Sequence, residues 1–497
     1  MLIRVSIPAE QWFRSLEALL ILVGASVVAC LILIPQAGLM AIVGCAALGF
    51  VAVVNNVFRG RIDGLVSCWA ALFPLTYFVS FPREHPIVTP QRLIVLGTFM
   101  GLSFVKPSSL MAIPKALSRA GLVCLAFIAV AGITLAKSPE VLGPAHILFD
   151  GFLLPIMFGW YVIARFDARC QLSALHTAVC ISSITCAAIA AAEIVTGEDL
   201  LPYEGASMFF TGGIPRPNGP FGSNDALALV GALSFFFLLF LRAAIGRNLS
   251  AGRRMLHSIG LAAAIGMALM PMFRSVMITL LLILIIDTFW DKKTTGRAWR
   301  VVLMLTFVGL ICMASVFAPD MFEDRISGQN VYGRMAQHEQ SLRVFMDHPW
   351  LGVGFNNFNN FVTGESRYLA SYQGVSSVDS PHSNLAAVLA ETGILGFVPY
   401  VITHILLLSA IWQLRHLSGY GGLVVRYCIY MFLTYWITGL TESTGFNPFV
   451  NLWYVFLITT CYKYAVTAPF AILPAEAQVP EGALSAPARI FSPLFLR

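Results

Sequence analysis

Four residues, Arg216, Arg274, Arg334 and His382, could carry chemistry at one face of a membrane. An arginine presents five N–H donors in a planar fork that fits phosphate oxygens in pairs, and it keeps its charge. A histidine has an ordinary pKa of about 6.5, so its neutral ring can accept a proton from a hydroxyl near pH 7. If these side chains converge, they suit a site that holds a diphosphate and activates a hydroxyl.

Each arginine also has a simpler explanation. Arg216 in "IPRPNGPFGSND" could donate to backbone carbonyls, although the prolines and glycine around it make the loop rigid. Arg274 lies between two apolar runs, and its side chain could extend to the membrane interface. Arg334 stands near the start of a predicted helix, where a cation opposes the helix dipole. That position favours an anion elsewhere as its partner.

His382 lies in "DSPHSNL", where a polar loop meets an apolar helix. It could be a base, or it could only hydrogen-bond near the helix start, with Ser383 or Asn384 as the N-cap. The local sequence leaves both explanations open.

Five further ionisable residues are assigned secondary roles. Glu391 and Glu442 have apolar surroundings, where we favour a structural hydrogen bond or ion pair over catalysis. Asp287 lies beside a basic cluster in the sequence and is predicted to form an ion pair at the membrane interface. Arg343 and His338 lie on the predicted polar helix and are interpreted as solvent-facing residues that could support the site.

The composition indicates a polytopic membrane protein. Of 497 residues, 58% are hydrophobic and only 11% are charged, whereas soluble proteins are about half apolar and about a quarter charged. The ten cysteines are scattered singly, without disulfide or metal-ligand spacing. We expect no metal, no cofactor and no nucleic-acid partner.

Apolar runs predict the elements that position these residues. A helix needs roughly 20 apolar residues to cross the hydrocarbon layer, since lipid offers the backbone no hydrogen-bond partner. The pattern therefore predicts an all-α fold with about 12–14 transmembrane helices. The runs lie at about 16–34, 37–57, 62–81, 91–105, 120–136, 142–164, 172–195, 226–241, 255–272, 275–290, 300–318, 385–411, 423–440 and 448–466.

Charge placement predicts the orientation. With a cytoplasmic N-terminus, most lysines and arginines fall in inner loops, as the positive-inside rule expects. The short outer loops hold few basic residues: Arg83, Arg92, Lys137, Arg216 and Arg274. The four candidate residues all fall on the outer, periplasmic face.

The chain is predicted to have four parts. An N-terminal transmembrane bundle (1–318) carries an ordered outer loop at 196–225. A periplasmic segment at 319–384 is expected to contain helices and the chemistry, because a structureless loop of this length is improbable. One helix is predicted in "GRMAQHEQSLRVFMDHPW", with Met335, Leu342, Phe345 and Met346 as a partial apolar face, and Pro349 and Gly352 are predicted to stop it. C-terminal transmembrane helices (385–466) and a flexible cytoplasmic tail (467–497) follow.

The stretch 333–396, with "GRMAQHEQSLRVFMDHPWLGVGFNNF" and "PHSNLAAVLAETGILG", resembles the core of the O-antigen ligase and polymerase family of bacterial inner-membrane glycosyltransferases. "RPNGPFGSNDALA" and "FRSVMITL" are similar to two upstream elements of that family. The resemblance implies metal-independent, inverting transfer of a glycan from an undecaprenyl-diphosphate carrier to a hydroxyl. Arg216, Arg274 and Arg334 would hold the diphosphate, and His382 would orient or deprotonate the acceptor.

The resemblance leaves the acceptor open. If the acceptor is a lipid A core sugar, the protein is a ligase. If the acceptor is a carrier-linked repeat, the protein is a polymerase of surface polysaccharide or exopolysaccharide, and we slightly favour this polymerase. Transfer to protein also remains open. Membrane lipids and a chain-length regulator are further expected partners. The alternative class is a transporter or flippase of lipid-linked oligosaccharide, although such proteins usually carry polar residues at mid-membrane depth.

Overall fold

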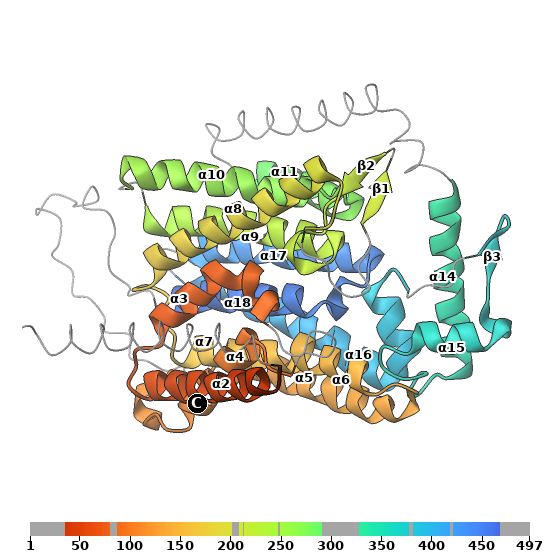
Figure 1. Cartoon of the computed structure of the whole chain (residues 1–497), viewed down its shortest axis with the longest axis horizontal. Helices are drawn as coiled ribbons and strands as arrows, with labels where there is room; N and C mark the ends of the chain where they lie inside the picture. Colours follow the sequence, from red (N-terminus) through yellow and green to blue (C-terminus); the bar gives the residue numbers. More distant parts are fainter. Residues whose placement is uncertain are drawn as a thin grey trace, which may run out of the picture.

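Helices account for almost all regular structure in the described part of the chain (Figure 1). The structure is a computed structural model that describes residues 35–79, 87–200, 208–211, 213–246, 249–290, 328–376, 381–417 and 421–467. The predicted spans at 16–34 and 300–318, and the predicted tail after residue 467, lie outside these ranges.

Six helical segments among the described residues are long and apolar enough to cross a membrane. The all-α polytopic membrane fold predicted from the sequence is confirmed, and the exact number of spans stays a prediction. The segments are α5 with its last turn (Lys115–Lys137), α6 to α7 (Leu142–Ala164), α8 (Leu172–Thr196), α9 (Asn224–Ile245), α16 with its last turn (Asn384–His416) and α17 (Gly421–Thr441).

The remaining α-helices of the described residues are α2 (Pro35–Phe58), α3 (Asp63–Leu72), α4 (Pro90–Leu102), α10 (Ala251–Leu269), α11 (Arg274–Trp290), α14 (Gly328–Asp347), α15 (Phe358–Gly364) and α18 (Pro448–Thr467). Among these helices, α3 and α18 pack inside the bundle, whereas α14 and α15 lie at one end of it (Figure 1). Two predicted spans are shorter than expected: the run at 62–81 breaks near Pro74, which cannot continue a helix, and the run at 91–105 ends its helix at Leu102.

Buried aromatic rings form the centre of the bundle, where α3, α7 (Leu154–Ala164) and α18 meet. Phe73 stacks on Trp453 with ring centroids 4.7 Å apart, and Trp69 meets Phe158 edge-on at 5.1 Å. The Trp453 indole donates to the Ser234 hydroxyl at 3.0 Å, so its polar atom is satisfied inside the core. This interior fixes α9 against α18.

The polar elements gather at one end of the bundle. Figure 1 shows α14 lying across the direction of the long helices, beside α15 and the hairpin strand β3. The hairpin of β1 (Phe209–Thr211) and β2 (Ile214–Arg216) lies toward the same end. The second hairpin, β3 (Ser371–Tyr372) and β4 (Val375–Ser376), packs on α14.

The predicted helix around Arg334 is confirmed as α14, and it ends at Asp347, two residues before Pro349. Its predicted apolar face is wrong as a packing face. Met335, Leu342 and Met346 are 43%, 55% and 69% exposed. The buried face instead consists of small and polar residues: Ala336, Gln337, Gln340, Ser341 and Val344.

A break in α16 (Asn384–Gln413) makes room for the chain that follows α14. Gly393 has a φ of 61° and a ψ of −166°, so the helix is interrupted there. The backbone of Trp350 and Leu351 packs against this point, where a Cβ on Gly393 would lie 2.4 Å from the Trp350 carbonyl carbon. Amides of Ile394 and Leu395, freed by the break, donate to the carbonyls of Pro349 and Trp350.

Candidate functional site

A buried carboxylate, Glu442, joins two of the four predicted residues. It directly follows α17, and its Oε2 lies 2.6 Å from Nδ1 of His382. Its Oε1 forms an ion pair with Arg334, which also donates to the Thr441 carbonyl at 3.2 Å. The side chain of Glu442 is 10% exposed, against 34% for Arg334 and 31% for His382. The carboxylate therefore lies beneath two groups that reach the surface.

Arg274 belongs to the same cluster. It is the first residue of α11, and the next residue, Ser275, shares a hydroxyl hydrogen bond with Thr441 at the end of α17. The charges of Arg334 and Glu442 both act on the Arg274 guanidinium. The contact between α11 and α17 thus brings Arg274 into the same electrostatic cluster as Glu442.

Arg216 is buried at the end of β2, and its Nε donates to the Pro271 carbonyl at 2.9 Å. Pro271 lies in the turn between α10 and α11, just before Arg274. A hydrogen bond to a backbone carbonyl is the simpler role considered for Arg216. The same bond also holds Arg216 next to the turn that precedes Arg274. The structure therefore places all four predicted residues at one end of the bundle.

The loop after Arg216 is held by carboxylates from α8 and the residues that follow it. The amide of Gly219 donates to Glu193 at 2.8 Å, and the Asn218 side chain donates to Asp199 at 3.1 Å. Gly219 adopts a positive φ of 57°, a conformation that glycine enters without a steric cost. These contacts account for the rigidity predicted for this loop.

His382 is positioned by the start of α16. Ser383 is the N-cap, with its hydroxyl accepting from the Ala386 amide at 3.4 Å. The buried Asn384 accepts from the Gly445 amide at 2.8 Å through its Oδ1. Gly445 lies shortly after Glu442 in the chain. This bond therefore holds the start of α16, and with it the His382 imidazole, next to the Glu442 carboxylate.

Two predicted supporting residues, Arg343 and Glu391, are engaged elsewhere, and so is Asp287, which is predicted as an ion-pair residue at the membrane interface. Arg343 pairs with Glu339 and donates to the Leu369 carbonyl at 3.2 Å. Glu391 accepts the Asn356 amide at 2.7 Å, the structural hydrogen bond expected for it. Asp287 forms the predicted ion pair, with Arg426.

His338 lies one turn after Arg334 on α14. Partial desolvation of its imidazole, together with the positive charges of Arg334 and His382, lowers the pKa of His338 below its ordinary value. The residue is therefore electrostatically linked to the cluster, although no hydrogen bond to the Glu442 carboxylate is found for it among the described contacts.

Sequence reasoning named Glu442, with a structural hydrogen bond or ion pair expected for it, but did not identify its two partners. It missed one further member of the cluster. Asp225, in the first turn of α9, was not considered; the charges of Glu442 and His382 act on it, and Ser223 donates to its carboxylate. The quoted "GSND" motif contained Asp225, so its acidic residue next to a helix start was the available signal.

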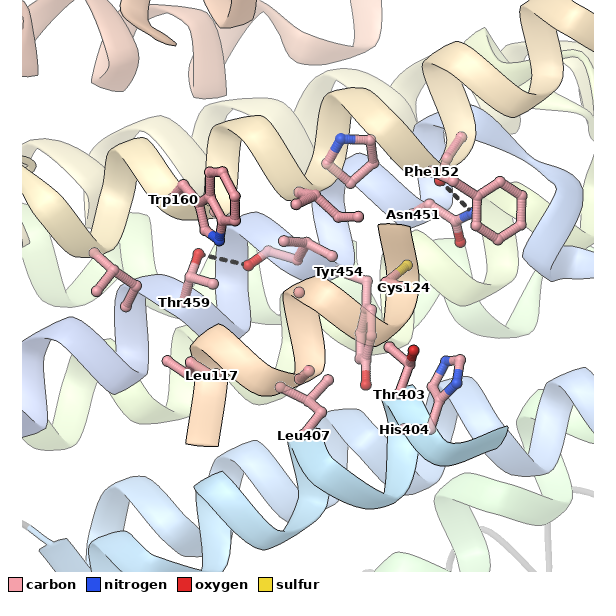
Figure 2. Close-up of a pocket in the computed structure, with 18 of the residues that line it drawn as sticks. Leu117, Cys124, Phe152, Trp160, Thr403, His404, Leu407, Asn451, Tyr454 and Thr459 are labelled. Atoms are coloured by element: carbon pink, nitrogen blue, oxygen red, sulfur yellow. Dashed lines mark hydrogen bonds between the residues drawn. The ribbon is translucent and has the colours of Figure 1, made fainter. Parts of the chain in front are cut away.

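An apolar cavity lies between the membrane-spanning helices (Figure 2). Its volume of about 140 Å³ is close to the roughly 150 Å³ of an engineered cavity that admits benzene. Tyr400 and Tyr435 also line a smaller cavity that reaches Asn384, two residues from His382. Residues labelled in Figure 2 include Leu117 and Cys124 of α5, His404 and Leu407 of α16, and Tyr454 and Thr459 of α18.

The geometry suits proton transfer next to an anion site. When neutral His382 donates its Nδ1–H to Glu442, its Nε2 carries the lone pair that a general base needs. Arg334 shares the Glu442 carboxylate with His382, and Arg274 is electrostatically linked to both Arg334 and Glu442, so the two guanidiniums can stabilise negative charge on a phosphate. The cluster can thus activate a hydroxyl and hold an anionic leaving group.

Comparison with known protein families gives one match. Residues 224–401 match the family model described as O-Antigen ligase. Arg274, Arg334 and His382 lie within the matched residues, whereas Arg216 and Glu442 lie outside them. No curated protein matches the chain.

Proposed function

We propose that this chain belongs to the O-antigen ligase family, whose model residues 224–401 match, and that it transfers a glycan from undecaprenyl diphosphate to an acceptor hydroxyl at the periplasmic face. The transfer is a single displacement that inverts the anomeric carbon and uses no metal. We favour a polymerase of a surface polysaccharide over a ligase.

The shared carboxylate is the observation that carries this proposal. One oxygen of Glu442 orients the imidazole of His382, and the other holds Arg334. A base and a phosphate-binding cation are thereby fixed relative to each other by a single buried side chain. Glycan transfer from a diphosphate needs this combination of a weak base and fixed positive charge.

In the proposed reaction, His382 Nε2 accepts the proton of the acceptor hydroxyl while its oxygen attacks the anomeric carbon. The new C–O bond forms as the bond from that carbon to the diphosphate oxygen breaks. The departing diphosphate keeps the electron pair, and Arg216, Arg274 and Arg334 stabilise its charge. Because a diphosphate leaves as a stable anion, no strong general acid is required.

Glu442 is a positioning residue in this mechanism. It holds the His382 ring with Nε2 directed away from the carboxylate, and it stabilises the imidazolium that forms. Asp225 adds a second negative charge near His382.

The polyprenyl tail of the donor is proposed to enter the apolar cavity of Figure 2. The lining comes largely from helices long enough to cross the membrane, so a lipid can approach sideways. The cavity has room for a short part of the chain, and the remainder would lie along the lipid-facing surface.

A deletion strain provides the test of the proposed function. Lipid-linked and surface glycans are extracted from cells that lack the protein. Single repeats accumulating on the carrier would support a polymerase, and finished polymer held on the carrier would support a ligase. Unchanged glycans in both fractions would contradict the proposal.

A further inference from the structure

Helix α14 directs its apolar side chains away from the protein. Met335, Leu342 and Met346 are exposed, whereas the side that packs on the molecule carries Gln337 and Gln340. Exposed apolar side chains at this spacing are unusual on a helix that packs against a protein core. Together they form an apolar strip on the outer side of α14 that a partner molecule can cover.

The exposed residues line a hollow of about 1010 Å³ between α14 and the segment that carries η6 (Ser366–Tyr368) and β3. The two-residue turn of the hairpin, Gln373 and Gly374, has positive φ at both positions, as in a tight type I′ turn. This turn returns the chain so that Tyr372 of β3 faces α14. The lining residues are Met335, His338, Glu339, Leu342, Arg343, Met346, Asp347, Arg367, Tyr368 and Tyr372.

Charges in the hollow are balanced within the protein. Glu339 pairs with Arg343, and Asp347 lies 3.7 Å from Arg367. The Tyr372 hydroxyl donates to Glu339. A surface with paired charges, a tyrosine ring and apolar side chains offers hydrogen bonds and stacking but no net charge. Its chemistry fits a neutral sugar chain, which has hydroxyl groups and apolar C–H faces.

The hollow begins next to the candidate site. His338 lines it, and the charges of Arg334 and His382 act on that residue. From Met335 to Asp347 the helix extends about 18 Å, long enough for several sugar residues. The donor sugar is fixed by its bond to the diphosphate among the arginines, so the hollow is left for the chain that brings the hydroxyl to His382.

We propose that the hollow along α14 binds the neutral glycan chain of the acceptor and presents its terminal hydroxyl to His382. This inference rests on the proposed function, since it assigns the second substrate of the same site. The ring of Tyr372 is the stacking surface, and the Glu339–Arg343 pair supplies hydrogen bonds to sugar hydroxyls.

The test is binding of acceptor glycan to the detergent-solubilised full chain, measured by titration calorimetry. The probe is the oligosaccharide released by mild acid from the surface glycan of the producing cells. Tyr372→Ala is expected to weaken binding about tenfold, while Tyr372→Phe retains it because the ring remains. Trp350→Ala is the matched control, because Trp350 is an exposed aromatic residue that does not line the hollow.

Binding is measured in parallel on His382→Ala, which separates the two proposals. Binding by this variant together with loss of transfer supports both of them. If the wild type binds the glycan but shows no transfer, the proposed activity is wrong and the proposed glycan site still stands.

In transfer assays, Tyr372→Ala should raise the acceptor KM with little change in kcat or in the donor KM. The inference would be overturned if Tyr372→Ala bound the glycan as tightly as the wild type. It would also be overturned if this variant changed only the donor KM, or if it altered the chain length of the product while binding stayed normal.

Discussion

At the scale of single residues, Glu442 decides how the site is organised. It contacts a histidine 60 positions away and an arginine 108 positions away. The sequence indicated Arg334 because a cation near a helix start opposes the helix dipole, and His382 because a neutral imidazole can accept a proton from a hydroxyl. It could not indicate their shared partner, since sequence separation of this size carries no local pattern. Glu442 was therefore expected to form only a structural contact.

The amide variant Glu442→Gln tests the positioning role. It preserves the shape of the side chain but removes the negative charge that orients the imidazole and stabilises its protonated form. We expect kcat to fall by about 10²-fold or more, with a smaller effect on the acceptor KM. The measurement is glycan transfer by purified protein in vesicles. Equal kcat values for Glu442→Gln and the wild type would exclude the assigned role.

The variants His382→Ala and Arg334→Ala test the two groups that Glu442 holds. Each should abolish transfer, since one removes the base and the other a guanidinium beside the leaving group. Membrane insertion should be intact, as measured by protein recovered in the membrane fraction. Arg343→Ala leaves the Arg334–Glu442–His382 contacts in place and changes only a pair in the hollow along α14, so its effect should be much milder and should appear in the acceptor KM. Near-normal polysaccharide from both test variants would count against the assignment.

Metal removal tests another part of the proposed chemistry. Arginine cations replace a metal ion as the stabiliser of the leaving diphosphate, so transfer should continue at its normal rate in excess EDTA. Loss of activity that returns with added magnesium would contradict this part of the proposal.

At the scale of elements, sequence patterns predicted where helices occur better than which side they bury. The end of α14 before Pro349 was predicted correctly, because proline restricts the residue before it. Its buried face was predicted wrongly, because the apolar side chains line a hollow while glutamines pack inward. The break in α16 was also not predicted, since it depends on the approach of the 349–352 backbone from a distant part of the chain.

That break makes Gly393 a sensitive position. Alanine there would meet both a positive φ and the Trp350 backbone, which would lie 2.4 Å from its Cβ. We expect Gly393→Ala to destabilise the protein by about 2 kcal/mol or more, measured as a lower Tm in detergent. Gly252→Ala is the control, because its Cβ would meet open space within α10. A Tm for Gly393→Ala equal to that of the control would refute the packing argument.

At the scale of the whole molecule, the helical membrane fold followed from the sequence because lipid permits few alternatives to helices. The four predicted site residues lie at one end of the bundle, as their shared outer-loop assignment required. The assignment of that end to the periplasm stays a prediction, and so does the number of spans.

Labelling with a membrane-impermeant maleimide tests the orientation. Gln373→Cys, in the turn of the second hairpin, should be labelled in intact spheroplasts. His416→Cys, at the opposite end of α16, should be labelled only after permeabilisation. The unsubstituted protein measures the background from native cysteines. The reverse pattern would place the site in the cytoplasm.

The ion pair between Arg334 and Glu442 has a consequence for the resting protein. Arg334 already has an internal counter-anion in Glu442, so a phosphate dissolved in the surrounding fluid would gain little by displacing it. A diphosphate delivered on a lipid has two advantages, since its greater charge competes better and its tail keeps it at high local concentration. Selectivity for membrane-borne over freely dissolved anions thus follows from a single carboxylate.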